Sequence, residues 1–266
     1  MYPYPVLFDK IGLYEIFLTI GVLSAFFIAD RLAVKRGFSL ALQRFFVVAI
    51  PLAIAVGFLG AVLFQAFYDF MQTGTFVVNN STGMTFYGGL IFGVLAFLLV
   101  WFVGALPFKL GKESRRRFAD VADIAACVIP LAHAFGRIGC FFAGCCHGLP
   151  TDSIFGVKMH TAQGLQSVLP VQLYEAAFLF LLSGATFFLF FKAKGKAKNV
   201  PLLSVYAVAY GVWRFFIEYL RGDDRGATVV SFLSPSQLTA LILMAAGVVY
   251  YCILFFYKRK NTEKTE

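Results

Sequence analysis

The sequence predicts an all-α integral membrane protein with seven transmembrane helices. Of its 266 residues, 60% are hydrophobic and only 14% are charged, whereas a soluble domain carries about 25% charged residues to hydrate its surface. The 33 Phe residues add more apolar surface than one core of this length would bury, so much of it must face lipid. This composition excludes a soluble enzyme, a disordered protein and a secreted disulfide framework.

Seven segments are long and apolar enough to cross a hydrocarbon core of about 30 Å, which takes about 20 helical residues. We place them near residues 12–32, 45–70, 87–107, 120–142, 170–191, 201–220 and 236–257. The first span lacks the positive region and the cleavage site of a signal peptide, so we expect it to be retained. The longest connection, near 144–169, is too short for a soluble domain, and residues 1–266 are therefore expected to form a single seven-helix transmembrane domain.

Most of the 23 basic residues lie after the first, third, fifth and seventh spans. By the positive-inside rule, the N-terminus is outside and the C-terminus is cytoplasmic. The net charge of +9 then reflects topology and contact with anionic membrane lipids, and no nucleic-acid partner is expected. Arg137, Arg214 and Arg221 fall outside these basic clusters, on the outer side.

The sixth span carries a polar stripe on one helical face. Tyr206, Tyr210, Arg214 and Glu218 follow one another at intervals of four, and Arg221 comes three residues later. A charged residue within a span costs at least about 2.5–3.5 kcal/mol on insertion scales, so the stripe must face a partner or a cavity. The simpler alternative is that Arg214 and Glu218 only pair with each other.

The fourth span ends with Arg137 between Gly136 and Gly139. Small neighbours let backbone or a ligand approach closely, and a guanidinium offers a planar fork of donors suited to phosphate oxygens. At the same outer depth, Gly88 and Gly89 open the third span, and Gln172 and Glu175 lie in the first turn of the fifth. Together these groups predict a polar site at the outer ends of the spans.

Cysteines cluster just beyond the fourth span, where Cys140, Cys145 and Cys146 precede His147. Paired C-x2-C spacings, which are typical of zinc sites, are missing from this run. A disulfide is permitted outside the cytoplasm. Small thiols that pack a loop are the favoured interpretation, and His133 is expected to be a core or hydrogen-bonding histidine.

The segment GRIGCFFAGCCHG resembles the signature of the bacterial prolipoprotein diacylglyceryl transferases. The resemblance covers nearly the whole chain: Tyr14 with Gly21 in the first span, YGGLIFG in the third, PVQLYEA in the fifth, YGVWRFFIEYLRGDD in the sixth and SPSQL before the seventh. That family also has seven spans with the N-terminus outside. The motifs occur in the family's order, so we expect the chain to be a member.

The resemblance implies an enzyme of the bacterial cytoplasmic membrane. It would transfer a diacylglyceryl group from phosphatidylglycerol to the lipobox cysteine of a preprolipoprotein signal peptide, releasing glycerol phosphate, with no cofactor and no metal. By position, Arg137 and Arg214 would hold the phosphate and stabilise the leaving charge, and Tyr14 and Tyr87 would complete the catalytic set. The residues expected to bind substrate are Gly88, Gly89, Gly136, Gly139, Cys140, Gly144, Gly148, Gln172, Glu175, Tyr210, Glu218 and Arg221.

Three positions depart from the family pattern. Tyr87 stands where a His is common, and a phenol with a pKa near 10 is a poorer base at neutral pH. Cys140 and Cys145 stand where the family has Asn and Glu. His147 or Tyr87 could serve as the base, or the thiol could arrive ionised. Two alternatives therefore stay open: a paralogue with another acceptor, and a non-enzymatic or thiol-redox protein that uses the Cys-Cys-His cluster.

Overall fold

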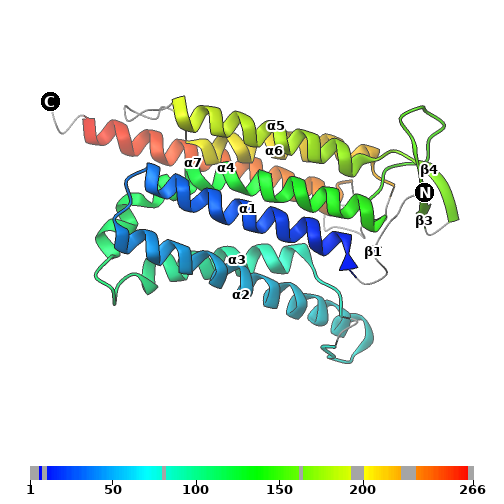
Figure 1. The fold of residues 1–266 in the computed structure, drawn as a ribbon, viewed down its shortest axis with the longest axis horizontal. Helices are drawn as coiled ribbons and strands as arrows, with labels where there is room; N and C mark the ends of the chain where they lie inside the picture. The colour runs from blue at the N-terminus through cyan, green and yellow to red at the C-terminus, as the bar shows by residue number, and fades with distance from the viewer. Residues whose placement is uncertain are drawn as a thin grey trace. The chain divides into compact units, whose positions relative to one another are not determined.

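The structure, a computed structural model, describes residues 6–7, 11–79, 82–161, 164–192, 201–222 and 232–262. These residues are mostly helical (Figure 1). The helices are α1 (Leu13–Lys35), α2 (Leu40–Thr73), α3 (Phe86–Leu99), the π-helix η1 (Val100–Gly104), α4 (Gly111–Ala143), α5 (Val171–Lys192), α6 (Leu202–Ile217), the 3-10 turn η2 (Glu218–Leu220) and α7 (Pro235–Thr262). Two antiparallel hairpins join β1 (Val6–Leu7) to β2 (Ile11–Gly12) and β3 (Val157–Thr161) to β4 (Gly164–Val168).

Five helices are long and apolar enough to cross a membrane, and they match the first, second, fourth, fifth and seventh predicted spans. They comprise Leu13–Lys35, Leu40–Met71, Gly111–Ala143, Val171–Lys192 and Pro235–Tyr257. The apolar helix at Gly88–Gly104 is shorter, and α6 has 16 residues, which rise about 24 Å at about 1.5 Å per residue. The prediction of an all-α membrane protein is confirmed, whereas the number of seven spans and their orientation stay predictions.

Two helices begin earlier than the hydropathy pattern predicts. The α2 helix starts at Leu40, because the Ser39 hydroxyl caps it by accepting from the Leu42 amide at 3.1 Å. The α4 helix starts at Gly111 and includes the basic run that the hydropathy pattern assigns to a connection. Hydropathy marks the apolar part of a helix, whereas capping groups and backbone hydrogen bonds decide where the helix begins.

The helices divide into two compact units, of which unit 2 is Asp30–Val121. Within it, α2 and α3 lie side by side (Figure 1). A Cβ atom at Gly88 would lie 2.6 Å from the Gly60 carbonyl oxygen, so this glycine is needed for helix contact. Beyond the other end of α3, the buried Trp101 indole of η1 donates to the Ser114 carbonyl at 3.0 Å.

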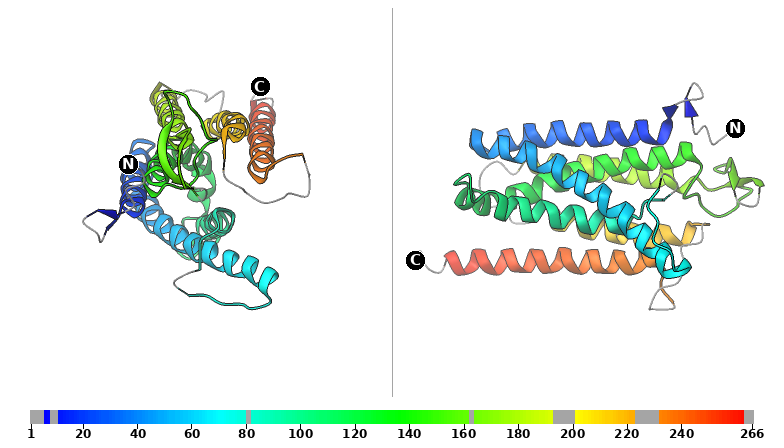
Figure 2. Two further views of the ribbon diagram at one scale, coloured as in Figure 1. Left: turned by 90° about the vertical axis from the view of Figure 1, so that its right-hand side faces the viewer. Right: turned by 90° about the horizontal axis from the view of Figure 1, so that it is seen from below.

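Unit 1 comprises Met1–Ala29 and Ala122–Glu266. Its α6 and α7 helices lie side by side (Figure 2), and a Cβ atom at Gly211 would lie 2.9 Å from the Ala240 carbonyl oxygen. The Asp123 carboxylate of α4 accepts from the Leu202 amide at 3.0 Å and so caps the start of α6. These contacts hold α6, which carries the polar stripe, against α4 and α7.

A small hairpin closes the end of unit 1 that carries the cysteines. Met159 of β3 and Val168 of β4 are buried against Phe141 near the end of α4. The sequence predicts no strand in this segment, because five-residue strands with mixed polarity carry a weak signal. The hairpin anchors the segment that follows α4 and so restrains the residues beside the predicted site.

Candidate active site

The polar stripe of α6 forms the centre of a buried ionic network. The Arg214 guanidinium lies 2.6 Å from Glu218 Oε2, and the Arg221 Nε lies 3.9 Å from the same oxygen. Earlier on the same face, the rings of Tyr206 and Tyr210 stack with their centroids 5.9 Å apart. The Arg214–Glu218 pair expected from the simpler alternative does form, and it belongs to a larger set of contacts.

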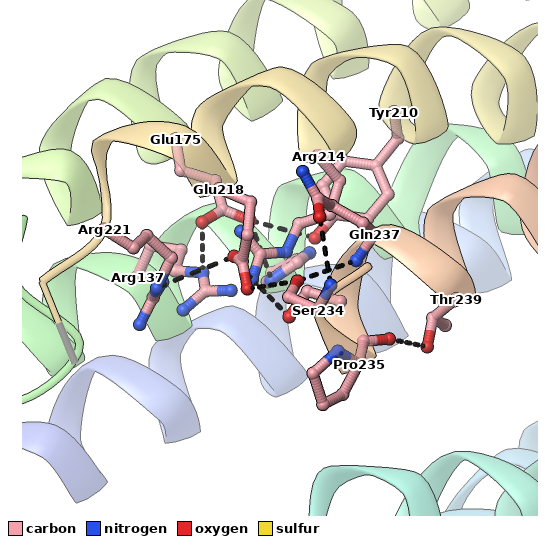
Figure 3. A network of polar contacts seen from close by, with 12 residues as sticks. Arg137, Glu175, Tyr210, Arg214, Glu218, Arg221, Ser234, Pro235, Gln237 and Thr239 are labelled. Atoms are coloured by element: carbon pink, nitrogen blue, oxygen red, sulfur yellow. Dashed lines mark hydrogen bonds and ion pairs between the residues drawn. The ribbon is translucent and has the colours of Figure 1, made fainter. Parts of the chain in front are cut away.

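Glu175 of α5 joins this stripe to α4 (Figure 3). Its carboxylate lies 3.0 Å from Arg137 Nε and accepts from the Tyr210 hydroxyl at 2.9 Å. The side chain is only 1% exposed, and a buried carboxylate is stable there only when it is paired and hydrogen-bonded. Glu175 therefore ties together three helices through one charged group.

His133 also belongs to the network. It precedes Arg137 by one helical turn, its Nε2 lies 4.0 Å from Glu175 Oε1, and its ring packs edge-on against Tyr210. The sequence predicts only a core or hydrogen-bonding histidine here. The i, i+4 spacing from Arg137 is a signal that could have placed both side chains on one face.

The start of α7 supplies hydroxyl groups that were not predicted from the sequence to belong to the site. Ser234 Oγ donates to Glu218 Oε1 at 2.8 Å (Figure 3). Arg214 Nη2 donates to Ser236 Oγ at 2.7 Å. Ser234 and Gln237 cap the helix reciprocally, since each accepts from the other's backbone amide. A Ser followed three residues later by Gln, with Pro between them, is a sequence signature of a helix start and could have drawn attention to these residues.

Among the residues that the structure describes, the guanidinium groups of the network outnumber its carboxylates. The cations are Arg137, Arg214 and Arg221, and the anions are Glu175 and Glu218. Arg214 Nη1 is buried and has no hydrogen-bond partner among the described residues. A buried, unsatisfied donor in a site with excess positive charge favours an anionic ligand with oxygen acceptors, such as phosphate.

Tyr14 and Gln172 lie beside the network. Tyr14, in the first turn of α1, packs on Gly139 and interacts electrostatically with Arg137 and Cys140. Gln172 is fully buried, and its amide donates to the Cys145 carbonyl at 2.7 Å. The structure therefore brings residues from α1, α4, α5, α6 and the segment after α4 together within unit 1.

The glycines expected to make room for a headgroup have different surroundings. A Cβ atom at Gly136 would meet nothing within 4 Å, so this position does border open space. At Gly139 it would lie 3.2 Å from the Tyr14 carbonyl, and at Gly148 it would lie 2.7 Å from the Leu169 carbonyl. Gly144 has a φ of 71°, which favours glycine. Packing and turn geometry thus account for three of these four glycines.

Tyr87, Gly88 and Gly89 lie at the start of α3 in unit 2. Gly88 contacts α2 closely, as described above, and a Cβ atom at Gly89 would lie in ordinary contact with Ala61 at 3.5 Å. The contacts that assemble the network all lie within unit 1. The expected part of these three residues in the site therefore rests on the sequence alone.

This fold and site define a multi-pass helical membrane protein with a buried, cation-rich polar network. The chain belongs to the prolipoprotein diacylglyceryl transferase family, whose family model matches residues 5–253. The phosphatidylglycerol–prolipoprotein diacylglyceryl transferase of Clostridium tetani (strain Massachusetts / E88) is 32% identical to it over 265 residues, which cover 96% of this chain and 99% of the relative.

Two further relatives have the same kind of name. Phosphatidylglycerol–prolipoprotein diacylglyceryl transferase 2 of Clostridium perfringens (strain 13 / Type A) is 29% identical, covering 95% of this chain and 94% of the relative. The corresponding enzyme of Finegoldia magna (strain ATCC 29328 / DSM 20472 / WAL 2508) is 30% identical, covering 89% and 88%. The similarity extends along whole chains, so the predicted family membership is confirmed.

Proposed function

We propose that this chain is a transferase that moves the diacylglyceryl group of phosphatidylglycerol to the lipobox cysteine of a preprolipoprotein. The observation that carries the proposal is the buried network in which the guanidinium groups of Arg137, Arg214 and Arg221 exceed the carboxylates of Glu175 and Glu218. The names of the relatives support the same donor and acceptor.

The proposed reaction places the growing charge on phosphate. The substrate thiol sulfur bonds to the glyceryl carbon of the lipid, the carbon–oxygen bond to phosphate breaks, and glycerol phosphate leaves with the bonding electron pair. The phosphodiester thereby becomes a phosphomonoester and gains negative charge. Arg137 and Arg214 would stabilise that charge in a site shielded from water, where fixed donors act most strongly. Glu218 would orient Arg214, and Glu175 would orient Arg137.

We also propose that the chain spans the cytoplasmic membrane seven times as one domain, with the network on the outer side. The alternation of basic connections supports this orientation, and the 16 residues of α6 extend through η2 toward the required length. Single-cysteine labelling of whole cells tests the topology, because a membrane-impermeant thiol reagent should reach positions in the 144–169 segment and should not reach the C-terminal tail.

The direct test uses purified protein, phosphatidylglycerol and a lipobox peptide. A thioether-linked diacylglyceryl peptide should appear by mass spectrometry, together with one glycerol phosphate for each peptide modified. Consumption of lipid without modified peptide would instead favour a paralogue with another acceptor. If neither lipid nor peptide is consumed by folded protein, the transferase proposal fails.

Ser236→Ala should lower the transfer rate by about 10-fold, since a hydrogen bond to a charged group contributes about 1.5–3 kcal/mol. The change removes the acceptor of Arg214 Nη2 and leaves the Arg214–Glu218 ion pair in place. Steady-state kinetics on the purified variant measure it. Thr239→Val is a matched control, because it also removes a hydroxyl from α7. The Thr239 hydroxyl donates to the Pro235 carbonyl of the same helix. Equal rates for both variants would contradict this role of Ser236.

We assign acceptance of the thiol proton to His133 rather than to Tyr87. A neutral imidazole has a free nitrogen lone pair at neutral pH, and His133 Nε2 lies 4.0 Å from Glu175 Oε1 within the network, whereas a phenol stays protonated at that pH. His133→Gln should therefore lower kcat about 100-fold, whereas Tyr87→Phe should leave kcat nearly unchanged. Steady-state kinetics at neutral pH check this, and an unchanged kcat in His133→Gln would remove His133 from the mechanism.

A further inference from the structure

Three cysteine sulfurs converge beside the network. Cys140 lies in the last turn of α4, and Cys145 and Cys146 follow the helix. Their Sγ atoms all lie within 4.8 Å of one another, and none of the three is in a disulfide bond. Cys140 and Cys146 are half-buried and Cys145 is exposed. The spacing C-x4-C-C differs from that of common zinc motifs, so the sequence alone favours simple packing.

The sulfur separation suits a shared metal ion. A Zn–S bond is about 2.3 Å long, which places two thiolates about 3.8 Å apart around a tetrahedral ion. The observed separations of up to 4.8 Å need to contract by about 1 Å at most. Among the described residues, the group contains no carboxylate and no imidazole. A set made only of sulfur selects a soft, thiophilic cation over Mg²⁺ or Ca²⁺.

The backbone holds the three thiols in this arrangement. Cys146 has a φ of 62°, a left-handed conformation that is uncommon for a residue other than glycine, and it costs roughly 1–2 kcal/mol. The Cys145 amide donates to the Cys140 carbonyl at 3.2 Å, and the Cys145 carbonyl accepts from Gln172. Such an outlier, kept in place by its surroundings, is typical of a functional position.

Positive charge is available to balance the thiolates. Three thiolates and one divalent cation carry a net charge of −1. The Arg221 guanidinium interacts electrostatically with Cys146, and Arg137 does so with both Cys140 and Cys146. The Gly222 amide donates to the His147 carbonyl at 3.2 Å, which ties the segment after α4 to the segment that bears Arg221. The site is thus compensated and anchored on both sides.

We propose that Cys140, Cys145 and Cys146 form a three-thiolate site for a thiophilic divalent cation, with Zn²⁺ as the probe and a fourth position open to water. A disulfide would use only two of the three convergent sulfurs and would need an oxidant that the transferase reaction does not supply. Metal binding uses all three, and the thiol protons are released to solvent. Occupancy of the site is measured without lipid or peptide, so failure of this proposal is distinguishable from failure of the proposed function.

The test is metal uptake by the full chain in detergent, reduced and then freed of metal and reductant. One equivalent of Zn²⁺ per chain is expected by calorimetry and by elemental analysis, and Co²⁺ should give sulfur-to-cobalt charge-transfer absorption. Cys146→Ser should weaken Zn²⁺ binding by more than about 100-fold, since even groups outside the ligand set contribute about 10–100-fold. Cys145→Ser, at an exposed position, provides a second variant that tests the site if Cys146→Ser fails to fold.

Cys252→Ser is the matched control, because Cys252 lies on α7 and outside the sulfur group. It should bind Zn²⁺ as the unmodified chain does. Absence of uptake by the reduced protein, or equal uptake by Cys146→Ser and Cys252→Ser, would overturn the proposal. Protein handled without reductant could instead have a mass 2 Da below that of the reduced chain, which indicates a disulfide. That mass, together with no Zn²⁺ uptake after reduction, would overturn the proposal in favour of a disulfide.

Discussion

Arg137→Ala is expected to reduce diacylglyceryl transfer by about 10²–10³-fold or more, the effect of removing one fixed donor from developing charge. The variant also leaves Glu175, which is 1% exposed, without its ion pair, and breaking a buried pair costs about 3–5 kcal/mol. Transfer rate and thermal unfolding should therefore both change. Steady-state kinetics and a melting curve on the same preparation measure the two effects.

A charge-neutral double variant separates catalysis from folding. Arg137→Gln combined with Glu175→Gln removes both charges. In the parent protein the Tyr210 hydroxyl donates to the Glu175 carboxylate, and the amide introduced on α5 keeps an acceptor oxygen for it. This variant should melt closer to the unmodified protein than Arg137→Ala does and should still transfer no lipid. Recovered activity in the double variant would show that Arg137 serves the fold alone.

Arg137→Lys should also lose most activity, because an ammonium group lacks the planar fork of donors.

Arg214→Ala is expected to reduce transfer about as strongly as Arg137→Ala does, with a smaller loss of stability. Its partner Glu218 keeps the Ser234 hydroxyl at 2.8 Å and Arg221 at 3.9 Å, so the carboxylate is not left alone. If Arg214 acts on charge that appears only in the transition state, kcat should fall about 10²–10³-fold while KM changes little. A higher KM with kcat unchanged would reassign Arg214 to ground-state binding of the lipid.

Arg214→Lys is the conservative companion of this variant. Arg214 Nη2 contacts both Glu218 and Ser236, and a lysine nitrogen can take its place. A lysine lacks the second nitrogen, Nη1, which has no hydrogen-bond partner among the described residues and is left for an anionic ligand. We expect melting near that of the unmodified protein and transfer between the rates of Arg214→Ala and the parent. Full activity in Arg214→Lys would mean that net charge matters and that the geometry of the fork does not.

Local periodicity carried much of the sequence-based prediction. The i, i+4 order of Tyr206, Tyr210, Arg214 and Glu218 places them on one face of any α-helix, and the ion pair between the last two follows from that spacing. Five long apolar helices likewise follow from composition and length. These features depend on helix geometry, which is the same wherever the helix packs.

Contacts between side chains of different helices could not be predicted from the sequence. The sequence predicts only that Glu175 binds substrate, and the packing of α4, α5 and α6 is what brings its carboxylate to Arg137 and Tyr210. The convergence of the three cysteine sulfurs depends on the left-handed backbone at Cys146 and on the contact with Gln172. Neither spacing nor residue type specifies such contacts, because they join residues far apart in sequence or depend on one unusual dihedral angle.

The sequence by itself determined the all-α membrane class, the family, and which arginines are available for function. Those conclusions rest on hydropathy, on motif order and on the position of charges along the chain. The tertiary structure decided how the charges are neutralised, which glycines serve packing, and which hydroxyl groups at the start of α7 join the network. The physical reason is that desolvated charges must find partners within hydrogen-bond reach, and helix packing alone sets which groups come within that distance.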